Sequence, residues 1–139
     1  MHGHRRLPHT ADVRIEAWAS TREQCLAEAV VGFVESFVDL SESPRERADR
    51  TRRVDLTEEA DEDVLVAVLN EVIYLMETAG EIPVSADAER AGGQVRVWLH
   101  LLPVDTVELT GAVPKAVSLH ELRFAPAAPG WACQVTIDV

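Results

Sequence analysis

The chain has 139 residues and a formal net charge of -11, from 24 Asp and Glu residues against 13 Lys and Arg residues. Its 47% hydrophobic and 27% charged content is typical of a globular protein and excludes a disordered or collagen-like chain. The acidic balance argues against direct binding to nucleic acid, because phosphate contacts need clustered Lys and Arg. With no apolar run long enough for a membrane span and no apolar signal segment, we expect one cytoplasmic domain over residues 1–139.

The first predicted elements are a strand and a helix. Polar and apolar side chains alternate over residues 13–18, which predicts a strand with one face on the core. Ser20 and Glu23 have the spacing of a capping box at a helix start. His2 and His4, ahead of the strand, are expected in a mobile start of the chain. The predicted helix covers residues 21–38, and its apolar stripe consists of Leu26, Ala29, Val30, Phe33, Val34 and Phe37.

A polar segment separates this helix from a second one. Residues 39–51 contain Pro44 and no apolar period, so they predict a loop. An arginine cluster from Arg45 to Arg53 begins in this loop and is expected to be solvated. A short strand over residues 52–56 and an acidic run over residues 58–63 follow. The acids complement the dipole at the start of a helix that ends at Gly80. A metal cluster in this run is the disfavoured alternative, because successive helical residues point in different directions.

The rest of the chain predicts strands, at residues 84–89, 94–101, 106–109, 116–124 and 131–139, with turns at Gly- and Pro-rich segments. The predicted fold is therefore α+β, with two helices packed on a mainly antiparallel sheet in the order β-α-β-α, followed by a C-terminal strand meander. Cys25 and Cys133 lie in apolar segments without a metal-type spacing and are expected to be buried free thiols. His100, in an apolar strand, is expected to be a hydrogen-bonded core residue.

Three places in the sequence could carry chemistry. In the last strand, polar and apolar residues alternate up to the final residue, which places the Asp138 side chain beside the Val139 carboxylate. Hard oxygen groups of this kind suit Ca²⁺ or Mg²⁺. A plain terminal strand without a metal is the alternative. Asp12 ends the segment His9-Thr10-Ala11-Asp12, where it fits either a turn before the strand or a site residue. Lys115 is the single lysine of the chain. Walker loops, dinucleotide fingerprints and GxSxG elbows do not occur.

Taken together, these motifs resemble the archease family. The resemblance rests on residues 9–12 with Ile15 and residues 17–18, on residues 69–74, on the segment Lys115-Ala116-Val117-Ser118 with His120, and on the ending Ile137-Asp138-Val139. The family implies an activator of RtcB-type RNA ligases in tRNA splicing or RNA repair, which promotes ligase guanylylation and repeated turnover and is not itself an enzyme. It also implies metal ligation by Asp12, Asp138 and Val139, and a functional Lys115 that assists the partner ligase.

The residues fit these expectations. A divalent metal, first Ca²⁺ with Mg²⁺ or Mn²⁺ as alternatives, would lie between the carboxylates, and Lys115 would contact a phosphate or an acidic ligase group. The expected partner is the ligase, with RNA met indirectly through it and with no membrane. One alternative function is a stand-alone metal-dependent phosphohydrolase, which the small number of clustered acids disfavours. The other is a chaperone-like protein-binding module.

Overall fold

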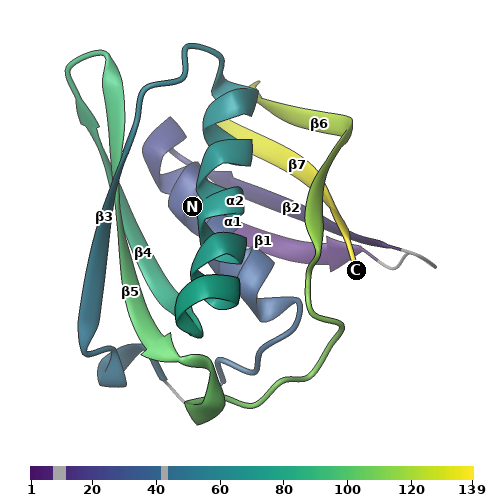
Figure 1. The fold of residues 1–139 in the computed structure, drawn as a ribbon. Helices are drawn as coiled ribbons and strands as arrows, with labels where there is room; N and C mark the ends of the chain where they lie inside the picture. Colours follow the sequence, from purple (N-terminus) through teal and green to yellow (C-terminus); the bar gives the residue numbers. More distant parts are fainter. Residues whose placement is uncertain (8–11, 42–43) are drawn as a thin grey trace.

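The computed structural model describes residues 1–7, 12–41 and 44–139, and it places both helices between two antiparallel sheets (Figure 1). One sheet has the strand order β1-β2-β7-β6 and the other β3-β5-β4. The first sheet comprises β1 (His2–Leu7), β2 (Asp12–Ala19), β6 (Ala116–Ala127) and β7 (Gly130–Asp138). The second comprises β3 (Arg50–Leu56), β4 (Glu81–Ala91) and β5 (Gln94–Pro103). The helices are α1 (Arg22–Glu35) and α2 (Asp61–Ala79).

The predicted α+β class and the order β-α-β-α followed by strands are confirmed. The strands form two sheets rather than one, because β5 pairs with β3 and β4 in a separate sheet, whose apolar face packs on the helices from the other side. No helix in the described ranges is long and apolar enough to cross a membrane.

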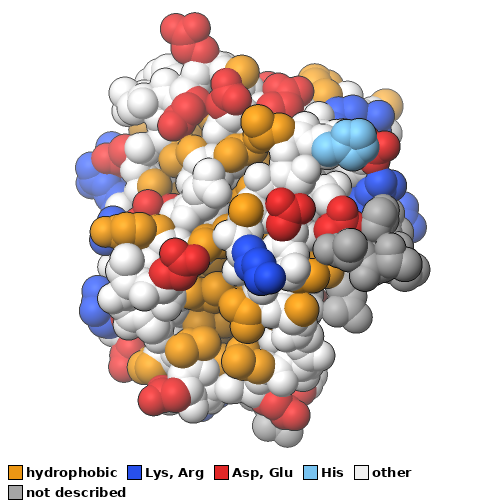
Figure 2. Space-filling model, turned by 45° about the vertical axis from the view of Figure 1, so that its right-hand side comes forward, with side chains coloured by type: hydrophobic (Ala, Val, Ile, Leu, Met, Phe, Trp, Pro, Cys, Tyr) orange, Lys and Arg blue, Asp and Glu red, His pale blue; other side chains and the backbone are white. Residues whose placement is uncertain are grey.

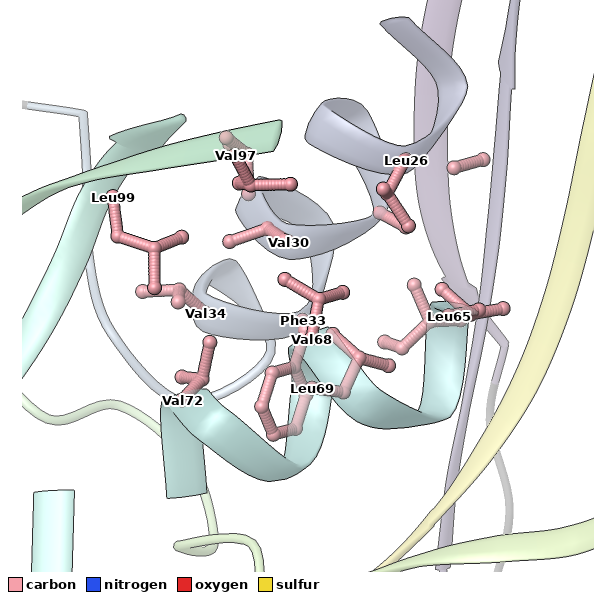
Figure 3. Close-up of a cluster of buried hydrophobic side chains, with 14 of the residues drawn as sticks. Leu26, Val30, Phe33, Val34, Leu65, Val68, Leu69, Val72, Val97 and Leu99 are labelled. Atoms are coloured by element: carbon pink, nitrogen blue, oxygen red, sulfur yellow. The ribbon is translucent and has the colours of Figure 1, made fainter. Parts of the chain in front are cut away.

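The core lies between the sheets, where the two helices meet. Leu26, Val30 and Phe33 of α1 face Leu65 and Leu69 of α2, with side chains from β5 on the far side (Figure 3). All five are at most 1% exposed, as the helical stripes of the sequence predict. Cys25 and Cys133 are also buried and free, which confirms that expectation.

The two helices begin and end at capping features of the kind that the sequence predicts, except that the N-cap of α1 lies one residue later. The N-cap of α1 is Thr21, whose Oγ1 accepts a hydrogen bond of 3.1 Å from the Gln24 amide, so the predicted capping box at Ser20 is wrong by one residue. Helix α2 has no side-chain cap at Ala60, but three acids occupy its first turn. It ends at Gly80, which has a φ of 62°, as predicted.

Several local expectations are wrong. His2 and His4 do not form a mobile start but belong to strand β1, which pairs with β2. The strand expected at residues 106–109 is replaced by a 3₁₀ turn and a single bridge between Val38 and Leu109. His100 lies on the outer face of β5, where its Nε2 is 2.7 Å from Asp87, so it is hydrogen-bonded but is not a core residue.

Candidate functional site

One end of the four-stranded sheet brings together residues that are far apart in the sequence. Asp12, the first residue of β2, is the register partner of Asp138, the last residue of β7. On the other side of β7, Asp138 is paired with Ala116 of β6. The backbone amide of Lys115 donates a hydrogen bond of 2.8 Å to the carbonyl oxygen of Asp138. The three predicted residues Asp12, Lys115 and Asp138 therefore lie at one sheet end.

The two aspartates project from the same face of the sheet. Cross-strand partners have Cα atoms about 4.5 to 5.5 Å apart and side chains on one side. Because Val135 and Ile137 of β7 point into the core, Asp138 points outward, and it is exposed. Asp12 is half-buried, with its Oδ1 atom shielded from solvent. Two carboxylates at this spacing repel each other, which favours a cation or an ammonium group nearby.

The side chain of Val139 holds the end of the chain in place. It is partly buried and packs against the hydrophobic core. Lys115, in contrast, is exposed and follows the buried Pro114, so its position is set by its backbone while its ammonium group is accessible. On the face of the molecule that Figure 2 shows, apolar side chains surround a basic one, and acidic side chains lie close by.

Other predicted site residues are not part of this arrangement. His9, Thr10 and Ala11 lie outside the described residues. Over residues 1–7, 12–41 and 44–139, no group of three or more His, Cys, Asp or Glu residues is placed to hold a metal ion. The alternative of a metal cluster in the acidic run therefore finds no support there: Asp61 begins α2 and forms an ion pair of 2.9 Å with Arg22 of α1.

Next to this sheet end, β6 contains a bulge that the sequence analysis did not predict. The register shifts between Ser118 and Arg123, and Glu121 has a φ of 55°. An ion pair with Arg14 holds the Glu121 side chain, and Gln134 donates a hydrogen bond of 3.1 Å to the Glu121 carbonyl. A non-glycine residue in this conformation is strained and persists because neighbours fix it. The sequence does carry a sign of the bulge, since the apolar positions change phase between Leu119 and Leu122.

The sequence can be compared with known proteins. The sequence profile of the Archease protein family matches residues 4–139. A protein from Mycobacterium tuberculosis named "Probable protein archease" is 53% identical over 137 residues, which are 99% of this chain and 75% of that protein. "Protein archease" from Archaeoglobus fulgidus is 29% identical over 143 residues and covers 98% of both chains.

Solved structures with the same fold are known. The solution structure of protein 1598 from Methanobacterium thermoautotrophicum superimposes with a TM-score of 0.76 at 19% identity and covers 99% of each chain. The crystal structure of a Thermotoga maritima protein, described as an archease and possible chaperone, gives a TM-score of 0.64 at 21% identity. It covers 96% of this chain and 94% of that one. At these identities the structures show a shared fold.

Proposed function

The chain belongs to the archease family, and from this premise we propose that it activates an RtcB-type 3′-phosphate RNA ligase in tRNA splicing or RNA repair. In this role it promotes guanylylation of the ligase and repeated turnover, and it is a protein cofactor rather than an enzyme. The observation that carries the proposal is the convergence of Asp12, Asp138 and Lys115 at one sheet end. Two aspartates and a lysine at one sheet end support a site for one phosphate-bearing partner.

The proposal includes a divalent cation held by Asp12, Asp138 and the Val139 carboxylate. Their oxygen atoms are hard donors of the kind that Ca²⁺ prefers, with Mg²⁺ or Mn²⁺ as alternatives. The cross-strand register of the two aspartates fits a shared ion. Since the site offers few protein ligands, water or the ligase would complete the coordination. Such a cation would stabilise negative charge on phosphoryl oxygens.

Lys115 has a separate role in this proposal. Its backbone amide is hydrogen-bonded to Asp138, so the residue is anchored at this sheet end while its side chain is exposed. An ammonium group is a compact charge that contacts one phosphate oxygen or an acidic group of the ligase. Arginine presents a planar fork and does not reproduce this contact.

The charge of the chain favours a protein partner over direct RNA binding. A net charge of -11 repels the phosphate backbone, and it complements the basic cleft of an enzyme that binds RNA. RNA is therefore met through the ligase. The Thermotoga maritima relative, described as a possible chaperone, is compatible with a protein partner too, and this chaperone-like binding is the second candidate function.

The test is RNA joining by the cognate RtcB-type ligase, measured as the guanylylated ligase fraction and as products per ligase. The reactions contain the unmutated protein, Asp138→Ala, Lys115→Ala, Glu89→Gln or no added protein. Glu89 is an exposed acid of β4, in the other sheet, and is the matched control. We expect acceleration with the unmutated protein and Glu89→Gln, and a loss of at least tenfold with the other two variants.

The remaining outcomes separate the candidate functions. No acceleration by the unmutated protein would contradict ligase activation. In that case, prevention of client aggregation that survives Asp138→Ala would support the chaperone-like function, and phosphoester hydrolysis by the purified protein would support a phosphohydrolase. Equal acceleration by all variants would leave ligase activation standing and overturn the assignment of the site residues.

A further inference from the structure

Exposed apolar side chains gather around Lys115. In the described part of the chain, the large hydrophobic residues that are exposed are Met1, Tyr74, Leu109, Val113 and Leu119. Three of these lie within residues 109–119, the segment that contains Lys115. Leu119 is 71% exposed and Val113 is 49% exposed. Single exposed apolar side chains need no explanation, but a group beside a candidate site indicates an interaction surface.

The bulge in β6 is the reason why Leu119 is exposed. Val117 and Ser118 keep the regular register opposite Ile137 and Thr136, and the ladder is then interrupted until Arg123. The strained backbone at Glu121 is fixed by its contacts to Arg14 and Gln134. Ser118 also accepts a hydrogen bond of 3.1 Å from the His120 amide. Three polar contacts thus hold a bulge whose most exposed side chain is apolar, which is typical of a binding element rather than of a stabilising one.

The position of these side chains relative to Lys115 follows from chain geometry. Val113 is two residues before Lys115 and Leu119 four residues after it, so the backbone places them within about 7 Å and 14 Å of Lys115. Glu108 and Glu121 are exposed acids near this segment in the sequence, and the exposed Asp138 accepts the backbone hydrogen bond of Lys115.

We propose that Val113 and Leu119, on either side of Lys115, are the apolar contacts through which this protein docks on its ligase, in a pocket bordered by basic side chains. This inference rests on the proposed function and adds the contact surface to it. A protein partner fits better than RNA, because aliphatic side chains cannot stack on bases as aromatic or guanidinium groups do, and because the surrounding acids repel phosphates. The same acids complement Lys and Arg at the rim of a ligase pocket.

The experiment measures the dissociation constant of the ligase complex by titration of the full-length chain onto immobilised ligase. The variants are Leu119→Asp, Val113→Asp, Leu119→Met and Gln94→Asp. Gln94 is the exposed first residue of β5, in the other sheet, so its substitution adds the same charge at a distant position. Leu119→Met keeps an apolar side chain, and the midpoint temperature of every variant verifies that it is folded.

We expect Leu119→Asp and Val113→Asp to weaken the complex at least tenfold, while Leu119→Met and Gln94→Asp stay within threefold of the unmutated protein. A basic partner would attract an added acid, so charge alone would not weaken the complex. A loss of affinity caused by Asp at these two positions therefore identifies an apolar contact. Unchanged affinity of both variants would overturn the inference and leave the proposed function intact. If Leu119→Asp or Val113→Asp reduced the crosslinking of this protein to RNA but left its affinity for the ligase unchanged, the inference would also be overturned, and an RNA contact would be indicated instead. Absence of any complex with the unmutated protein would overturn the proposed function together with its contact surface.

Discussion

The backbone amide of Lys115 donates a hydrogen bond to the carbonyl oxygen of Asp138, at 2.8 Å. This bond joins the start of β6 to the end of β7 and leaves both side chains free to face a partner. A change to either side chain therefore keeps the backbone bond, so that chemistry at the site can be altered without loss of the sheet.

The first prediction concerns Ca²⁺ binding. Asp138→Asn removes one carboxylate charge from the proposed site but keeps the size of the side chain. A ligand that binds the folded state stabilises it, by about 2.7 kcal/mol at a concentration one hundred times its dissociation constant. We expect Ca²⁺ to raise the midpoint temperature of the unmutated protein and of Glu89→Gln, but not that of Asp138→Asn. The measurement is a series of thermal unfolding curves at increasing Ca²⁺ concentration, without ligase. An equal rise in the midpoint temperature of Asp138→Asn would contradict the assignment of Asp138 as a metal ligand.

The second prediction concerns His4 and pH. Its Nδ1 contacts Glu28, and its Nε2 lies 2.8 Å from Oε2 of Glu35. The hydrogen bond to Glu28 and, after it, that to Glu35 raise the pKa of His4 above its usual 6.5, against the opposing effect of burial. Carboxylates accept hydrogen bonds, so both contacts are satisfied by the doubly protonated ring. His2 is the other titratable group here, with its Nε2 3.7 Å from Glu28.

The sign of the pH effect follows from the raised pKa. The stabilisation by His4 is complete below pH 6.5, the value of the unfolded chain, and is lost as the pH rises through the higher folded value. The free energy of unfolding of the unmutated protein should therefore exceed that of His4→Gln most at pH 5.5 to 6.5, with a difference that shrinks toward pH 9. Urea unfolding at several pH values measures this. His120→Gln is the control, because that side chain is 79% exposed. A difference that does not depend on pH would refute a protonated His4.

The third prediction concerns Gly32, a glycine in the last turn of α1. A Cβ atom there would lie 2.8 Å from Cγ and Cδ2 of His4, so the absence of a side chain allows the imidazole ring to lie on the helix. Gly32→Ala should improve helix propensity by about 1 kcal/mol and yet destabilise the protein by about 1 to 3 kcal/mol through this overlap.

A double-mutant cycle separates the two effects of Gly32→Ala. In a His4→Gly background the overlap is absent, because the His4 Cβ atom, which would also lie 2.9 Å from the new Cβ, is removed with the ring, so Gly32→Ala should become stabilising by about 0.5 to 1 kcal/mol. Denaturant unfolding of the four proteins gives the coupling between the two positions. The same effect of Gly32→Ala in both backgrounds would show that His4 does not pack on the helix.

The fourth prediction concerns the two thiols. Cys25 and Cys133 are buried, and the hydrogen bond between the Cys133 thiol and the side chain of Cys25, together with burial, raises the pKa of Cys133. Because the thiolate is the reactive form, neither cysteine should react with Ellman's reagent in the native protein at pH 8. Labelling should accelerate with urea in proportion to the unfolded fraction. Fast labelling of one thiol without denaturant would indicate a local opening of α1 or β7.

Much of the fold could be predicted because its information is local. The apolar stripe of α1, which includes Leu26 and Phe33, and the alternation from Cys133 to Ile137 are patterns of neighbouring residues that define helix and strand. Strand β1 escaped prediction because its residues are polar, and its pairing with β2 depends on the contact of His4 with α1. The division of the strands into two sheets is likewise a property of pairing, which periodicity does not encode.

The same distinction applies to the candidate site. The sequence by itself singled out Asp12, Lys115 and Asp138 by residue type, motif and position. Their proximity was decided by the tertiary structure, since it depends on the registers of β2 and β6 against β7. The bulge that exposes Leu119 also depends on Arg14 and Gln134, which are distant in the chain. A sequence pattern reports which face of its own element a side chain takes, whereas register and long-range hydrogen bonds determine which elements meet there.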